Sequence, residues 1–169
     1  MPFRSVLAAV DFSTTSRTAL SFAARLASAH GALLHVLYVQ DPALSAVARN
    51  AGIDLQRELH DHLEAFVSSA RPAAECRRHL HVALGSAAAE ICRQARRRGV
   101  DVIVVGNRGL SDSPLVTIGA TAAEVLRCAS RPVLVLPDAR DSKSHRRLTR
   151  GVVPRPPRSE AAEIARLPR

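Results

Sequence analysis

Five short apolar runs, separated by segments with helical periodicity, restrict this 169-residue chain to a small set of folds. Apolar runs of this length are typical of buried strands, whereas apolar residues every three or four positions indicate helices. Strands that alternate with helices pair in parallel through right-handed crossovers. The pattern therefore predicts an α/β fold with an open, doubly wound, parallel five-stranded sheet. We expect strands at residues 5–10, 32–39, 78–84, 101–106 and 132–136, and helices at about 14–30, 54–69, 86–98 and 120–129.

The ends of two predicted helices carry residues that suit those positions. The Ser13 hydroxyl can accept a hydrogen bond from an orphan N–H at the start of the first helix. Gly31 and Gly99 follow two helices, where a residue in the left-handed conformation commonly ends the helix. The run at 78–84 alternates apolar with polar residues, so we expect its strand to be the more exposed one. Spacing alone does not give the order of the strands in the sheet.

The last 32 residues differ in composition from the rest of the chain. Overall, 47% of residues are hydrophobic and 23% are charged, a balance that excludes a disordered or collagen-like protein. Residues 138–169 hold nine Lys or Arg against four Asp or Glu, which is five of the nine net positive charges. They also hold four prolines and few apolar side chains. We predict a folded domain at 1–137 and a mobile, basic, Pro-rich tail at 138–169.

The tail raises the question of nucleic acid. A basic arm attracts phosphates, but residues 138–169 contain no aromatic side chain on which bases could stack. Specific nucleic-acid binding is therefore not expected, and weak, salt-sensitive attachment stays open as an alternative.

The sequence also bears on the compartment. No apolar run approaches the roughly 18 residues of a membrane span, and the N-terminus shows no secretory signal. Cys76, Cys92 and Cys128 are odd in number, far apart and without a C-x-x-C motif. We therefore expect a cytoplasmic protein with no membrane association and with reduced, structural thiols.

A glycine-containing loop carries the main chemical signal. Gly106-Asn107-Arg108-Gly109 follows the fourth strand, and nine residues later Gly119-Ala120-Thr121 opens the last helix. Glycine allows backbone N–H groups to approach an anion, and the helix N-terminus adds unpaired donors suited to phosphate. Arg108 could add a guanidinium contact. The alternative is that these glycines merely permit tight turns.

Asp11 ends the first strand as Gly106 ends the fourth. If these two strands are neighbours, both residues face the crevice at the carboxyl ends of the sheet, where open α/β sheets bind ligands. A carboxylate there can accept hydrogen bonds from ribose hydroxyls or hold a metal. Alternatively, Asp11 is a loop residue that accepts a hydrogen bond from the N–H of Ser13 or Thr14.

These residues together resemble the universal stress protein family over roughly residues 1–137. The resemblance rests on five features in order: Val10-Asp11-Phe12-Ser13, His35-Val36, Leu84-Gly85, the Gly106-x2-Gly109-x9-Gly119 spacing before Ala120-Thr121, and the closing Pro132-Val133-Leu134-Val135. It implies a Rossmann-like sheet like that of the adenine nucleotide hydrolases, in the order 3-2-1-4-5. It also implies a cytoplasmic homodimer formed along the last strand, acting as a stress-response or signalling module.

The resemblance further implies an ATP site, with or without magnesium. Adenine would lie against Ala9, Val10 and Val36, and ribose near Asp11 and Gly106. The phosphates would lie over Gly109, Gly119, Ala120 and Thr121, with Arg108 nearby. ATP-binding relatives typically carry Ser or Thr where this chain has Ala120, and a lost hydrogen bond to a charged group costs about 1.5–3 kcal/mol. We expect weakened ATP binding; the alternative is a nucleotide-free member that acts through protein partners.

The other candidates predict little chemistry. His79 and His81 could share one side of a strand, but no third metal ligand is evident beyond nearby Cys76, so a solvated pair is favoured. The chain has no G-x-S-x-G elbow, no Walker A lysine and no H-E-x-x-H motif. We expect no catalytic residues, no metal site and at most slow ATP hydrolysis. We also expect ATP to order the loop 107–120 and so to change a partner-binding surface.

Overall fold

The computed structural model describes residues 3–45, 55–70, 76–110 and 117–138. Except for Asp138, the predicted tail lies outside the described residues. The centre of the loop 107–120 and most of the connection 41–53 lie outside them as well. The strands are β1 (Ser5–Val10), β2 (Leu33–Gln40), β3 (Arg78–Leu84), β4 (Val102–Gly106) and β5 (Val133–Leu136). The helices are α1 (Thr14–His30), α3 (Leu55–Ser69), α4 (Ala87–Arg98) and α5 (Ala120–Cys128).

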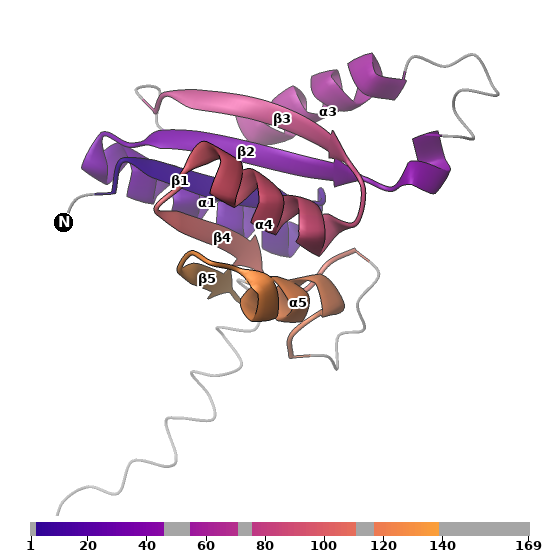
Figure 1. The fold of residues 1–169 in the computed structure, drawn as a ribbon. Helices are drawn as coiled ribbons and strands as arrows, with labels where there is room; N and C mark the ends of the chain where they lie inside the picture. The colour runs from indigo at the N-terminus through magenta and orange to yellow at the C-terminus, as the bar shows by residue number, and fades with distance from the viewer. Residues whose placement is uncertain (1–2, 46–54, 71–75, 111–116, 139–169) are drawn as a thin grey trace, which may run out of the picture. The chain divides into compact units, whose positions relative to one another are not determined.

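The five strands form one sheet in which every neighbouring pair is parallel, in the order β3-β2-β1-β4-β5 (Figure 1). Both the parallel doubly wound fold and this strand order are confirmed. The order makes β1 and β4 neighbours, with Ala8 opposite Val104. The carboxyl ends of these two strands therefore lie side by side.

Alternating side chains of each strand enter two different cores. Val6, Ala8 and Val10 of β1 belong to the core under α1 and α3, whereas Leu7 and Ala9 belong to the core under α4 and α5. This alternation follows from the two-residue period of a strand. Helices thus cover both faces of the sheet, and its central strands are buried on both. The predicted exposure of the third strand is confirmed, because no residue of β3 is fully buried.

The predicted helix ends are confirmed as well. The Ser13 hydroxyl accepts a hydrogen bond from the Ser16 N–H at 3.1 Å, and Gly31 and Gly99 follow α1 and α4 with φ of 62°. Within the described residues, no helix is long and apolar enough to cross a lipid bilayer.

The prediction of three reduced cysteines is wrong for two of them. Cys92 of α4 and Cys128 of α5 form a disulfide across 36 residues of sequence, with their Cα atoms 6.6 Å apart. Spacing along the chain did not reveal the pair, because the fold places α4 and α5 next to each other on one face of the sheet. Cys76 is a free, buried thiol whose pKa is raised by burial.

Candidate functional site

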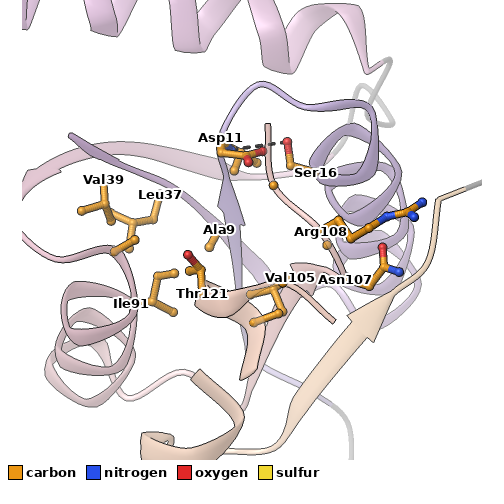
Figure 2. A pocket seen from close by; sticks show the side chains of 16 residues that line it. Ala9, Asp11, Ser16, Leu37, Val39, Ile91, Val105, Asn107, Arg108 and Thr121 are labelled. Atoms are coloured by element: carbon orange, nitrogen blue, oxygen red, sulfur yellow. Dashed lines mark hydrogen bonds between the residues drawn. The ribbon is translucent and has the colours of Figure 1, made fainter. Parts of the chain in front are cut away.

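A crevice lies at the carboxyl ends of β1 and β4, on the side of the sheet that α4 and α5 cover (Figure 2). Its cavity volume is about 100 Å³, and it opens to solvent. Residues of β1, β2 and β4 line the crevice, and residues near the N-terminal ends of α4 and α5 complete its walls. This is the edge of a parallel sheet at which ligands commonly bind.

One wall of the crevice is apolar. Ala9 of β1, Leu37 and Val39 of β2, and Val105 of β4 project toward the same face of the sheet, and Ile91 of α4 lies opposite them (Figure 2). The strand residues share this face because they occupy alternate positions of parallel neighbours. The wall is suited to a flat, weakly polar group such as a nucleobase.

Asp11 lies at the mouth of the crevice and is already hydrogen-bonded. Its Oδ1 accepts bonds from the N–H of Ser13 at 3.1 Å and from the Ser13 hydroxyl at 2.5 Å. Its Oδ2 accepts a bond from the N–H of Leu110 at 3.0 Å. The local contact to Ser13, which was the alternative reading of this residue, is therefore present. A carboxylate has about four acceptor sites, so a further hydroxyl could still be bound.

The residue after Asp11 has an uncommon backbone conformation. Phe12 has φ of 66°, a left-handed value that a bulky side chain rarely adopts. Its ring stacks on His62, with ring centroids 4.5 Å apart, and also contacts Tyr38 and Phe66. Burial, together with the Asp11 and Asp41 carboxylates, raises the pKa of Tyr38, so its phenol stays neutral. The aromatic contacts hold the backbone that turns Asp11 toward the crevice.

Gly106 is required by close packing. A Cβ built on Gly106 would lie 3.0 Å from Thr15 Cβ, 3.1 Å from the Thr15 carbonyl carbon and 3.2 Å from the Ser16 nitrogen. The Thr15 hydroxyl in turn donates to the carbonyl oxygen of Arg108 at 2.5 Å. The first turn of α1 thus lies directly against the start of the glycine loop.

Asn107 joins the two ends of that loop. Its carbonyl accepts a hydrogen bond from the Gly119 N–H at 2.7 Å, and its Nδ2 donates to the Thr117 carbonyl at 3.0 Å. The Asn107 N–H donates to Leu136 of β5 at 2.8 Å. Its buried Oδ1 has no partner among the described residues. The glycine spacing drew attention to the neighbours of Asn107 and missed this residue.

The N-terminus of α5 faces the crevice. Gly119 is its N-cap, with φ of −70° and ψ of 161°, and no side chain among the described residues caps the helix. The first intrahelical bond runs from the Ala123 N–H to the Gly119 carbonyl at 3.0 Å. The amides that precede Ala123 therefore gain no partner from a cap, and the hydroxyl of Thr121 is directed into the cavity (Figure 2). Such an end attracts anions.

The structure brings together eight of the ten residues predicted for this site. Val36 does not line the crevice, because its side chain is fully buried in the core on the opposite face of the sheet. Ala120 is exposed and also lies outside the lining. Leu37 and Val39 of β2 line the crevice instead, and the two-residue alternation of a strand could have predicted this. The eight residues that line the crevice are Ala9, Val10, Asp11, Gly106, Arg108, Gly109, Gly119 and Thr121.

The chain resembles known proteins in both sequence and structure. Residues 2–137 match the model of the Universal stress protein family. The chain is 30% identical to Universal stress protein YxiE of Bacillus subtilis over 146 residues, which cover 79% of this chain and 99% of that protein.

Two solved structures share the fold. Universal stress protein UspA from Lactobacillus plantarum superposes with a TM-score of 0.65 at 25% identity, covering 80% of this chain and 99% of that one. A universal stress protein in complex with cAMP superposes with a TM-score of 0.61 at 20% identity, covering 82% of this chain and 100% of that one.

Proposed function

The chain belongs to the universal stress protein family, and from this premise we propose that its crevice binds an adenine nucleotide, with ATP as the preferred ligand. We further propose that the protein serves as a stress-response or signalling module. One observation carries the proposal: an apolar wall, a carboxylate and an uncapped helix N-terminus line the same crevice. These three features match the base, the ribose and the phosphates of a nucleotide. A solved relative in complex with cAMP adds support.

We propose a position in the crevice for each part of the nucleotide. The base would lie against Ala9, Leu37 and Ile91, where it would cover apolar surface. The ribose hydroxyls would donate to the acceptor capacity that remains on Asp11. The phosphates would meet the first amides of α5 and the Thr121 hydroxyl. This assignment replaces the predicted contact with Val36, which faces the other core.

Magnesium has no dedicated ligand in this arrangement. Asp11 is the one carboxylate among the described lining residues, and it already accepts bonds from Ser13 and Leu110. Magnesium would therefore arrive with the phosphates of ATP.

Substituting Gly119 by valine tests the proposal. The Gly119 dihedrals are open to any L-residue, so valine adds no backbone strain and places two methyl groups at the phosphate end of the crevice. We expect ATP affinity, measured by isothermal titration calorimetry, to fall at least about 100-fold, which corresponds to about 2.7 kcal/mol. The unfolding midpoint is measured alongside, because Gly119 is buried and a larger side chain there also affects packing.

Ala123→Val is the matched control, because Ala123 is an exposed residue of the same helix outside the crevice. It should leave ATP affinity unchanged. Ala120→Ser should tighten binding about tenfold or more if the serine hydroxyl recovers a hydrogen bond to a phosphate. Wild-type protein that shows no saturable heat with ATP would refute the proposed function.

We also propose a homodimer formed through β5. β5 is an edge of the sheet, and the exposed fractions of Leu134 on β5 and of Leu126 on the adjoining α5 are 37% and 47%. An unpaired edge beside apolar side chains is a template for pairing with a second chain. Light scattering should give twice the 18.1 kDa chain mass. Leu134→Asp should give the monomer mass, whereas Leu44→Asp, at an exposed leucine on another surface, should remain dimeric.

A further inference from the structure

Three histidines gather on the face of the sheet that α4 covers. His35 of β2 and His79 of β3 are opposite each other in the parallel register, and His81 follows two residues after His79 on the same side. The Nδ1 of His35 lies 3.0 Å from the Nε2 of His81. One ring nitrogen from each of the three lies within 4.8 Å of the other two.

His35 is the ligand that the sequence did not reveal. His79 and His81 read as a pair without a third partner, because His35 is more than forty residues away along the chain. The β2–β3 register brings it beside them. His35 is buried, His81 is half-buried and His79 is exposed, so the cluster is anchored in the core and reached from the outer edge of the sheet.

We propose that His35, His79 and His81 bind one divalent transition-metal ion of the zinc, nickel or copper type. Imidazole nitrogens suit these metals. Zinc–nitrogen bonds are about 2.0–2.1 Å long, so two nitrogens on a tetrahedral zinc ion lie about 3.3–3.4 Å apart. The 3.0 Å between the His35 and His81 nitrogens is already close to this distance, and the widest separation in the cluster has to shorten by at most about 1.5 Å. A water molecule or an anion would fill a fourth position.

The protonation state of the cluster suits a metal, which binds neutral imidazole. Burial, with Arg98 and the neighbouring histidines, lowers the pKa of His81 to about 4, and burial likewise lowers the pKa of His35. Both rings are therefore neutral at pH 7. One of the two rings now donates an N–H hydrogen bond to the other. On metal binding this proton moves to the far nitrogen of the same ring, so the tautomer changes and no proton leaves the pair.

Other side chains around the cluster set its affinity. The Arg98 guanidinium acts on both His35 and His81, and its Nε is buried without a partner among the described residues. This charge opposes a cation. The outer groove beside His79 and His81 is also lined by Glu64 and Arg78, so the negative charge of one side chain is offset by the positive charge of the other. The Cys76 thiol stays protonated because burial raises its pKa.

Zinc titration of the full-length, tag-free chain tests the proposal. In competition with a chromophoric chelator, wild-type protein should bind one zinc ion per chain. Cobalt should give the visible absorption of a four-coordinate site, which reports the ligand set independently of affinity. His79→Gln removes the exposed ligand and leaves the buried His35–His81 pair intact, so the fold should persist by circular dichroism. Zinc affinity of this variant should fall at least about tenfold, and that of His79→Gln/His81→Gln further.

The control is a histidine outside the cluster, and a second variant tests the nearby charge. His30 lies at the end of α1 against Phe3, on the opposite face of the sheet. The variant His30→Gln should therefore bind zinc as tightly as wild type does. Arg98→Gln should tighten zinc binding about threefold or more, because it removes a like charge. The proposal is overturned if wild-type protein binds no zinc at one ion per chain, or if the His79 and His81 variants bind it as tightly as wild type.

Discussion

Reduction of the Cys92–Cys128 disulfide is expected to lower the free energy of unfolding by about 4 kcal/mol. The bond closes a loop of 36 residues, and a cross-link of that span removes many conformations from the unfolded chain. In the native state it joins α4, which supplies Ile91 to the crevice, to α5, which supplies Thr121. Urea unfolding with and without a phosphine reductant measures the change.

The double variant Cys92→Ala/Cys128→Ala serves as the control, since its stability should not respond to the reductant. Denatured but unreduced wild-type protein should alkylate at Cys76 alone, as the one free cysteine of the three. Alkylation of all three, or an unfolding midpoint that is insensitive to the reductant, would contradict the cross-link.

Gly106→Val is expected to cost about 3 kcal/mol of stability. The added Cβ would lie 3.1–3.2 Å from backbone atoms of Thr15 and Ser16, so the first turn of α1 would have to move. Side-chain rotation offers little relief, because two of the three nearest atoms belong to the backbone. The helix cap at Ser13 and the Thr15–Arg108 bond would be disturbed as well. Thermal or urea unfolding measures the loss.

Gly31→Ala separates the effect of space from the effect of conformation. Gly31 has φ of 62° but nothing within 4 Å of a built Cβ, so alanine there should cost only about 1 kcal/mol. A Gly106→Val variant that is no less stable than Gly31→Ala would show that α1 does not pack against β4 as described.

The strands, the helices and their parallel pairing could be predicted because each follows from a pattern within a short stretch of sequence. The apolar run 5–10 and the cap at Ser13 appear in the structure as β1 and the start of α1. The strand order came from the family resemblance, since no spacing in the sequence places β4 beside β1. That order in turn put Asp11 and Gly106 at one crevice.

The errors and omissions depend on contacts between distant segments. The disulfide needs α4 and α5 to be neighbours, and the histidine cluster needs the β2–β3 register. Val36 is different, because strand alternation alone could have turned it away from the crevice and pointed to Leu37. The left-handed backbone of Phe12 had no local signal, and in the structure its ring packs against Tyr38, His62 and Phe66.

The position of β1 at the centre of the sheet has a consequence for biosynthesis. β1 leaves the ribosome first, and β2 can pair with one of its edges soon afterwards. Its other edge has no partner until Val102 has been translated. Throughout that interval the nascent chain presents an apolar strand with unsatisfied backbone groups, the kind of surface that associates with other chains. The strand at the centre of the sheet is thus the one that waits longest for its second neighbour.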